Sequence, residues 1–301
     1  MPETVEWATG PEGASWYAIN LGIARLIAEK TRSIDIRVVA GGGKGNPTRV
    51  NDGESQFGTT IDFLSAAAYH GMPPYEKPHL KLRTIGIGWS PPPFHLVASN
   101  KVTLGLSEAL LSGQLRIGVP PRSTSDELTF QRILLFYGTS YDQLTVSGSH
   151  IRFGDYNELV SDFANNRTDY VFGATAAPAT AVTAMGDSLA RGRLLPFPTE
   201  LMDHLSATYG YGCGKIGAGT YPRMQQGDIA TTVMETIFLV SSDLLESVVY
   251  EATKTLVENR RALSEIHNSM AGYDPRIAWQ DVPVPLHPGA ARAYHELGFM
   301  R

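Results

Sequence analysis

The chain has 301 residues, of which 43% are hydrophobic and 18% charged, with a formal net charge of −5. This length suits two α/β lobes of about 100–150 residues each, and the composition excludes general disorder. Because no basic run exceeds the pair Arg260–Arg261, the charge pattern argues against nucleic acid as a partner.

Strands and helices are expected to alternate along the chain, because period-two and helical hydrophobic patterns follow one another. In the first part of the chain, the pattern predicts a strand at 5–9, a helix at 15–31 and strands at 34–40, 56–60, 82–87 and 95–99. A second series follows, with strands at 115–119, 150–153, 169–172 and 194–197 and helices at 126–137, 156–165 and 178–190 between them. Three consecutive prolines at 91–93 separate two of these strands, since proline continues neither a helix nor a sheet.

Repeated β-α-β units imply parallel sheets with helices on both faces. The sequence therefore predicts a bilobed α/β fold, with two doubly wound sheets joined by a hinge. Lobe 1 is expected to comprise residues 1–97 and 205–301, lobe 2 residues 98–204, and the ligand cleft to lie between them. The segments 96–99 and 201–208 are the candidate hinge.

Membrane, metal and disulfide roles find no support in the sequence. No apolar run approaches the roughly 18 residues of a membrane span. Cys213 is the one cysteine, so neither an internal disulfide nor a cysteine-rich zinc site is expected, and the eight histidines lack metal-ligand spacing. We therefore expect no metal and no cofactor. No leader of basic and then apolar residues opens the sequence, which fits a cytosolic protein or an exported protein without its signal peptide.

Ligands of open α/β sheets sit beyond the carboxyl ends of the strands, so the turns that follow the strands predict the site. These turns are small, hydroxylated and glycine-rich, and most precede a helix N-terminus, which is a favourable place for an anion. The predicted ligand-binding residues are Thr9, Gly10, Gly13, Ser15, Trp16, Tyr17, Gly43, Thr60, Asp62, Arg122, Ser123, Thr124, Ser125, Thr175 and Ala176. Of these, Ser15, Asp62 and Ser125 are expected as N-caps.

Several of these residues have an alternative interpretation. Trp16 and Tyr17 either give a ligand an apolar or stacking wall or belong to the core. Arg122 either clamps a carboxylate or is a solvated loop charge. Asp62 and Glu12 would suit an ammonium group instead of an anion.

Signals for catalysis are weak, and no catalytic residue is predicted. The stretch GCGKIG at 212–217 fits the G-x-G-x-x-G pattern, but it leads into a turn and not into a helix, so the dinucleotide interpretation fails. No G-x-S-x-G elbow and no H-E-x-x-H motif is present. His287, between Leu286 and Pro288, is expected to make a structural hydrogen bond.

A family resemblance runs along nearly the whole chain. The stretches that carry it are ATGPEGASWYAIN at 8–20, IDIRVVAGGG at 34–43, NDGESQFG at 51–58, VPPRSTSDELT at 119–129, AGTYP at 218–222 and VPLHPGAARAYHELG at 284–298. They resemble the TAXI family, the extracytoplasmic solute receptors of TRAP transporters. The resemblance implies a type II periplasmic-binding-protein fold, a periplasmic location, and delivery of a small solute to TRAP permease subunits. Known ligands of such receptors are mainly small carboxylates and amino acids of the glutamate type.

The chain departs from the family pattern at three positions. Trp16 is larger than the usual residue, Ile61 removes an amide, and Arg122 adds a charge where glycine is usual. These departures predict a small organic anion with an apolar or aromatic part that meets Trp16. The alternatives are an enzyme or a ligand-sensing module on the same fold, since fold does not determine function. The closing segment 284–298 is expected to pack against the first lobe.

Overall fold

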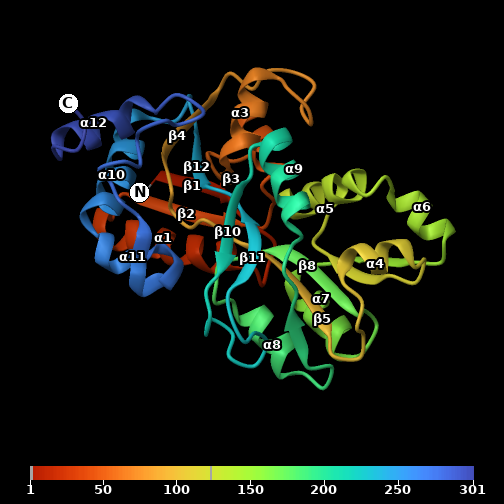
Figure 1. Cartoon of the computed structure of the whole chain (residues 1–301). Helices are drawn as coiled ribbons and strands as arrows, with labels where there is room; N and C mark the ends of the chain where they lie inside the picture. The colour runs from red at the N-terminus through yellow and green to blue at the C-terminus, as the bar shows by residue number, and fades with distance from the viewer. Residues whose placement is uncertain (1–2, 123) are drawn as a thin grey trace. The chain divides into compact units, whose positions relative to one another are not determined.

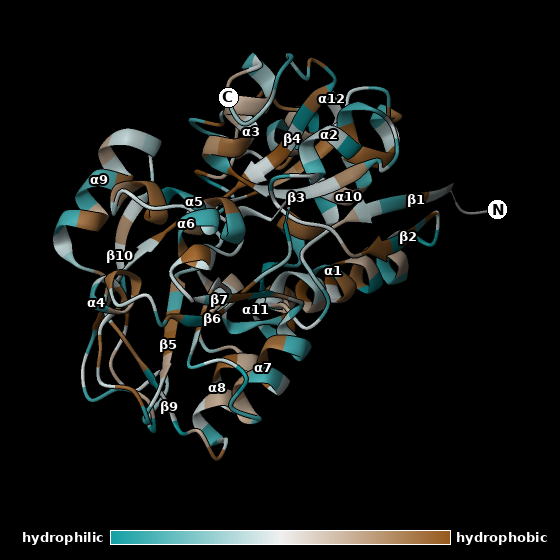
Figure 2. Cartoon of the chain, turned by 90° about the vertical axis from the view of Figure 1, so that its right-hand side faces the viewer, coloured by the Kyte–Doolittle hydropathy of each residue, from teal (hydrophilic) through white to brown (hydrophobic). Residues whose placement is uncertain are grey.

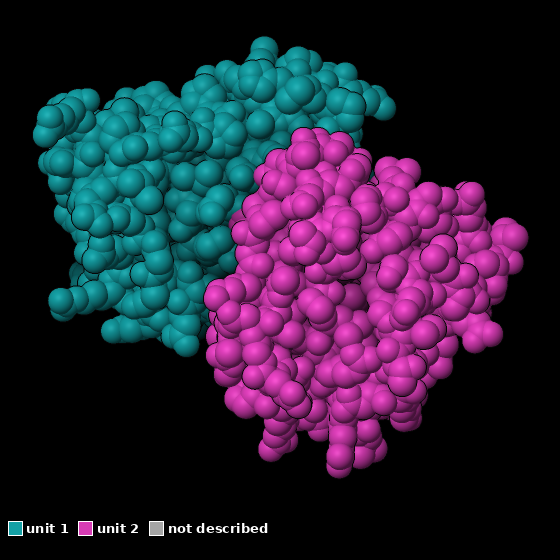
Figure 3. All heavy atoms as spheres, in the orientation of Figure 1, with its two compact units in different colours: residues 1–10, 15–91, 235–301 teal, residues 11–14, 92–234 magenta. Residues whose placement is uncertain are grey.

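The computed structural model describes residues 3–122 and 124–301, and the chain forms two compact units. Unit 1 comprises residues 1–10, 15–91 and 235–301, and unit 2 comprises residues 11–14 and 92–234 (Figure 3).

Unit 1 contains both ends of the chain and is built from strands with helices between them (Figure 1). Its elements are β1 (Glu3–Ala8), α1 (Ser15–Thr31), β2 (Ile34–Val39), α2 (Asn46–Asn51), β3 (Phe57–Ile61), α3 (Asp62–His70), β4 (Leu82–Ile87), β12 (Thr236–Ser241), α10 (Glu246–Glu258), α11 (Arg260–Ile266), the 3₁₀ helix η1 (Asn268–Gly272) and α12 (Pro288–Glu296).

The five-stranded sheet of unit 1 has the order β2-β1-β3-β12-β4. Strands β2, β1 and β3 are parallel, whereas β12 runs antiparallel to both of its neighbours. Strands β1, β3 and β12 meet in an aromatic core, in which Trp7 stacks on Phe57 at 5.1 Å between ring centroids and meets Phe238 edge-on at 5.0 Å. These contacts place β12, which is distant in sequence, inside the sheet.

Unit 2 repeats this arrangement with different residues. Its elements are β5 (Phe94–Ser99), α4 (Leu106–Leu111), β6 (Arg116–Val119), α5 (Ser125–Phe136), α6 (Tyr141–Val146), β7 (His150–Phe153), α7 (Tyr156–Ala164), β8 (Tyr170–Ala174), α8 (Thr180–Asp187), β9 (Gly192–Leu194), α9 (Thr199–Tyr209), β10 (Gly212–Ile216) and β11 (Ile229–Val233). The sheet order is β7-β6-β8-β5-β9, and β5 is the antiparallel strand. All six residues of β5 are buried, and Figure 2 shows its hydrophobic character. Strands β10 and β11 form a separate two-stranded antiparallel sheet.

The predicted α/β fold with two sheets is confirmed, but the expectation of purely parallel sheets is wrong, because β12 and β5 run antiparallel to their neighbours. The predicted strands and helices have counterparts, although the strand expected at 194–197 lies at 192–194. The stretch GCGKIG forms β10 and the start of a turn, so it does not open a helix. The chain passes between the units at 10/11, 14/15, 91/92 and 234/235. The segments 96–99 and 201–208 form part of β5 and α9, and the predicted lobe boundaries and hinge stay predictions. The expected ligand cleft stays a prediction.

The motif at 284–298 forms helix α12 and the turn before it, and its residues have structural roles. His287 is its N-cap, and its Nδ1 accepts the N–H of Gly289 at 3.2 Å. A Cβ on Gly289 would lie 2.3 Å from the carbonyl oxygen of Glu246, so this glycine lets α12 approach the backbone of α10. Tyr294 donates its hydroxyl to the Ile85 carbonyl at 2.9 Å. The expected packing of this segment on the first lobe, and the structural role of His287, are confirmed within unit 1.

Candidate functional site

The carboxyl ends of three parallel strands bring together the predicted residues of unit 1. Thr9 and Gly10 follow β1, Gly43 lies in the loop after β2, and Thr60 lies within β3, one residue before its end. The Thr60 hydroxyl donates to the Gly43 carbonyl at 2.5 Å, so these two predicted residues are in direct contact. The loop at 41–45 is therefore held in place, although its composition alone suggests a flexible turn.

The N-terminus of α1 is the part of this edge that is best suited to an anion. The first N–H groups of a helix have no acceptor inside the helix, and the first turn of α1 holds no acidic residue to compensate them. Trp16 lies in that turn and is 9% exposed, and its indole N–H has no hydrogen-bond partner among the described residues. Gly13, which precedes the helix, has a φ of 77°, a value that favours glycine.

Buried hydrogen bonds among polar side chains hold the segment between β1 and α1 in place. With its amide oriented to satisfy its neighbours, Asn20 accepts the Thr9 hydroxyl at 3.0 Å and donates to the Trp16 carbonyl at 3.3 Å. The Trp7 indole N–H donates to the Thr59 hydroxyl at 2.9 Å. Because the Thr9 hydroxyl donates inward, Thr9 shapes the turn and does not present its proton outward. Asn20 was not among the predicted residues, since it lies in the middle of a helix.

The three residues expected as N-caps each occupy the first position inside a helix instead. Helices α1, α3 and α5 begin at Ser15, Asp62 and Ser125. A cap residue needs an extended backbone, and for α3 and α5 that backbone belongs to the preceding residues Ile61 and Thr124. The Thr124 hydroxyl accepts a backbone N–H of α5, whereas Ile61 has no side chain that could do so.

Asp62 places a carboxyl group at the start of α3. Its Oδ1 accepts the N–H of Phe63 at 2.8 Å, and its own N–H donates to the Glu235 carbonyl at 3.0 Å. Burial raises the pKa of Asp62 to about 6, although hydrogen bonds from backbone N–H groups oppose the shift. Burial also raises the pKa of Glu235, and the charge of Asp62 adds to this effect. This end of the edge therefore favours protons or cations, in contrast to the start of α1.

In unit 2 the predicted residues follow the parallel strands β6 and β8. Ser123 lies outside the described residues. Thr175 and Ala176 are both buried directly after β8, and the Thr175 N–H donates to the Pro93 carbonyl at 3.3 Å. The guanidinium of Arg122 is exposed and lies 4.6 Å from the ring centre of Phe153.

Helix α5 has two acidic residues in its first turn, Asp126 and Glu127. Asp126 is buried, and its Oδ1 accepts the Ala174 N–H at 2.5 Å and the Tyr156 hydroxyl at 3.2 Å. Burial raises the pKa of Asp126. Glu127 is also buried, and its Oε1 lies 4.0 Å from Arg122. Acidic residues therefore already occupy the positive end of this helix, and Arg122 has a carboxylate neighbour of its own.

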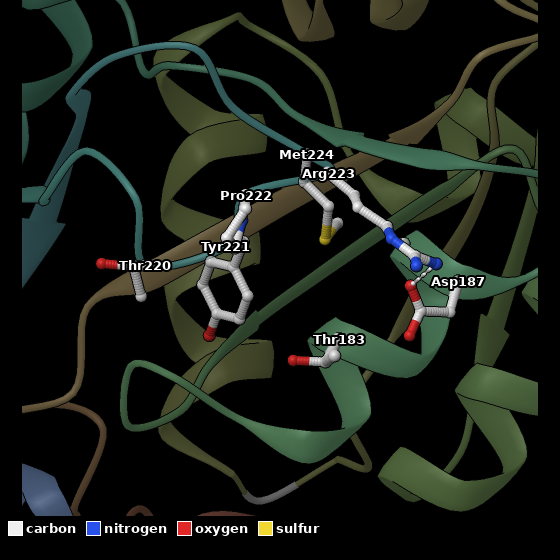
Figure 4. Close-up of a pocket in the computed structure, with 8 residues that line it drawn as sticks. Thr183, Asp187, Thr220, Tyr221, Pro222, Arg223 and Met224 are labelled. Atoms are coloured by element: carbon white, nitrogen blue, oxygen red, sulfur yellow. Dashed lines mark hydrogen bonds and ion pairs between the residues drawn. The ribbon is translucent and has the colours of Figure 1, made fainter.

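Three cavities formed by the described residues lie within single units, and no predicted site residue lines any of them; one, of about 520 Å³, is open and lies beside α11 in unit 1. The first, of about 290 Å³, is formed by α8 and the loop after β10 and includes Tyr221 and Met224 (Figure 4). Its Thr183 and Thr220 hydroxyls already donate to backbone carbonyls, and Arg223 pairs with Asp187 at its rim. The second, of about 390 Å³, lies in unit 1. Its lining residues are Ile87, Gly88, Pro91, Glu235, Ser269, Gly272, Asp274, Ile277, Ala278, Gln280 and Asp281.

The described residues contain no cluster of three or more His, Cys, Asp or Glu side chains arranged to hold a metal ion. Within the same part of the chain, no helix is long and apolar enough to cross a membrane.

The two five-stranded sheets, each with an antiparallel strand inserted beside three parallel ones, define a type II periplasmic-binding-protein fold. MatC from Rhodopseudomonas palustris with bound malate is similar, with a TM-score of 0.58 and 13% identity over 98% of each chain. An ancestral arginine-binding protein bound to arginine has a TM-score of 0.52 and 12% identity over 90% of this chain and 100% of its own. A putative L-cystine ABC transporter from Listeria monocytogenes has a TM-score of 0.51 and 11% identity over 90% of this chain and 97% of its own. At these identities the similarity supports the fold and not a ligand.

Within this fold, the chain belongs to the NMT1-like family, whose model matches residues 7–298. The narrower resemblance to TAXI receptors stays a prediction.

Proposed function

We propose that this chain is a solute receptor that binds a small organic anion, either a carboxylate or an amino acid with an apolar or aromatic part. The observation that carries the proposal is the start of α1, where the first turn contains no acidic residue and the buried Trp16 indole N–H lacks a partner among the described residues. A helix N-terminus stabilises an anion by about 0.3–1 kcal/mol, more where it is partly buried. Micromolar binding needs about 8 kcal/mol, so direct hydrogen bonds such as that of Trp16 must supply most of it.

We further propose that the receptor works outside the cytoplasm and delivers its solute to a TRAP-type permease without changing it chemically. The motifs at 119–129, 218–222 and 284–298 support the TRAP assignment through their resemblance to TAXI receptors. A similar structure described as an L-cystine ABC transporter makes an ABC permease the alternative. Uptake reconstituted with each candidate permease separates them, because a TRAP system needs an ion gradient and an ABC system needs ATP.

Replacing Trp16 with phenylalanine tests the anion site directly. The ring packing is largely kept and the N–H donor is lost, so we expect at least tenfold weaker binding of L-malate or L-glutamate by calorimetry. Trp279→Phe is the matched control, because its indole N–H also lacks a partner among the described residues but lies elsewhere in unit 1. Equal affinities for wild type and Trp16→Phe would place the site elsewhere. Thr9 is unsuitable for a bulky replacement, since it is fully buried.

A thermal-shift panel tests the solute class. L-Malate, L-glutamate and phenylpyruvate are expected to raise the melting temperature, whereas putrescine and glucose are not, because neither carries an anionic group. Stabilisation by putrescine alone would assign the site to cations at Asp62. Mass spectrometry of the released compound addresses the enzyme alternative, which requires a changed product.

Arg122→Ala tests the contribution predicted for unit 2. We expect a smaller loss of affinity than for Trp16→Phe, because Glu127 lies beside the guanidinium and offsets its charge.

A further inference from the structure

Asn46 lies at the junction of the segments that form the binding edge of unit 1. It follows the glycine loop, opens α2, and is fully buried. Its Nδ2 donates to the carbonyl oxygens of Ala8 at 3.2 Å, Thr9 at 2.9 Å and Thr59 at 2.7 Å. Its Oδ1 accepts the N–H of Gly42 at 3.1 Å.

The place of this amide in the sheet shows why the contacts matter. The register between β1 and β3 pairs Trp7 with Phe57 and Ala8 with Gly58, and the named strand pairing stops there. Thr9 and Thr59 come next, and the Asn46 amide bonds to both of their carbonyls. A buried carbonyl that loses its donor costs free energy, so the side chain stabilises the backbone of Thr9 and Thr59 beyond the last register pair of β1 and β3.

The glycine loop is built around the same amide. A Cβ on Gly41 would lie 2.3 Å from the Asn46 Oδ1 and 2.9 Å from the Thr9 carbonyl oxygen, so only glycine fits there without displacement. The Gly41 N–H donates to the Gly10 carbonyl at 3.3 Å. The loop is thereby joined to the residues that lead toward α1.

We propose that Asn46 is the positioning residue of this binding edge: it sets the relative places of the Thr9–Gly10 turn and the glycine loop, and through them the affinity for the solute. It acts through these segments and does not itself contact the solute. The assignment of the edge as a binding site rests on the function proposed above, whereas the ordering of the loop by Asn46 does not.

Asn46→Ala tests the proposal, with His287→Ala as the control. Both variants lose a buried hydrogen-bonding side chain of unit 1, but His287 caps α12, and its side chain bonds to Gly289 and not to the glycine loop. We expect at least tenfold weaker L-glutamate or L-malate binding for Asn46→Ala at a temperature where both variants are folded, and unchanged affinity for His287→Ala. Equal affinities of the two variants, with similarly lowered melting temperatures, would overturn the proposal.

A second readout needs no ligand. Amide hydrogen exchange of residues 41–45 is expected to be at least tenfold faster in Asn46→Ala than in wild type, and unchanged in His287→Ala. If Asn46→Ala does not fold, Asn46→Ser replaces it, because its shorter hydroxyl side chain cannot make all the contacts of the amide to the strand carbonyls and the glycine loop. This variant is expected to give a smaller change in the same direction. Unchanged exchange in the folded variant would overturn the proposal.

If wild type binds neither L-glutamate nor L-malate, the proposed anion-binding function is refuted. Amide hydrogen exchange of residues 41–45 then tests the role of Asn46 by itself. Faster loop exchange would support its ordering role, and unchanged exchange would refute it. The two proposals can therefore fail separately.

Discussion

Asp62→Asn is expected to stabilise the protein at pH 7 relative to wild type, and to do so much less at pH 4. Burial raises the pKa of the Asp62 carboxyl from 3.8 to about 6. Between these values the native state holds a proton that the unfolded state has released. The stability that this proton contributes is complete below pH 3.8 and is lost as the pH rises through 6. Asparagine is nearly isosteric, still accepts the Phe63 N–H, and does not ionise in this range.

The size of the effect follows from the pKa. A change from 3.8 to about 6 corresponds to about 3 kcal/mol of free energy of unfolding, at about 1.4 kcal/mol per pKa unit. Asp62 is partly exposed, so about 3 kcal/mol is an upper value. Removing its charge also lowers the pKa of Glu235, which makes the variant less sensitive to pH in the same range.

Wild type alone does not reveal this effect, because His95 opposes it. Burial lowers the pKa of His95 to about 4, so the unfolded state binds more protons between pH 4 and 6.5. The His95 contribution to stability therefore rises with pH while that of Asp62 falls. Both proteins contain His95, so its contribution cancels when the free energy of unfolding of wild type is subtracted from that of Asp62→Asn.

Urea unfolding at pH 4, 5, 6 and 7 measures this difference. We expect the variant to gain up to about 3 kcal/mol over wild type as the pH rises from 4 to 7. Glu235→Gln serves as the comparison and is expected to show a change of the same sign. Parallel stability curves for wild type and Asp62→Asn would refute the idea that burial penalises the Asp62 carboxylate.

Three further variants test other parts of the fold. His287→Ala is expected to lower the free energy of unfolding by about 1–2 kcal/mol through loss of the α12 cap, and His287→Asn to restore part of it, as urea titration would show. Gly289→Ala is expected to cost about 1–3 kcal/mol, since its Cβ would meet the Glu246 carbonyl; wild-type stability would contradict the close approach of α12 to α10. His95→Gln is expected to reduce the loss of stability as the pH falls from 6.5 to 4, and an unchanged slope would show that His95 is not held neutral.

The sequence predicted the parts of the fold that depend on local patterns. Helix 15–31 and the strands around it follow from hydrophobic periodicity and glycine turns, and the structure places them within one or two residues. Helix starts were harder to place, because Ser and Asp suit both the cap and the first turn. Asp62 and Ser125 show this, as the backbone angles of the preceding residues decide which position each takes.

Contacts between distant residues could not be predicted from these patterns. In the sequence, Asn46 is indistinguishable from other polar residues of a turn. Its contacts become visible only in the fold, where the carbonyl oxygens of Ala8, Thr9 and Thr59 all accept its amide N–H groups. Arg122 likewise suits a carboxylate clamp by position, and its neighbours Phe153 and Glu127 become visible only in the fold. The ligand-binding residues as a set remain a prediction for the variants described above.

The insertion of β12 between β3 and β4 has a consequence for the order in which the two sheets can form as the chain is made or exported. Residues 92–234 hold all the strands of the unit 2 sheet, so this sheet is complete once that stretch has been made. The unit 1 sheet lacks an inner strand until residues 236–241 have emerged, although its strands β1 to β4 precede every strand of unit 2. Unit 1 therefore begins first and finishes last, and a chain released at residue 234 would contain one complete sheet and one divided in two.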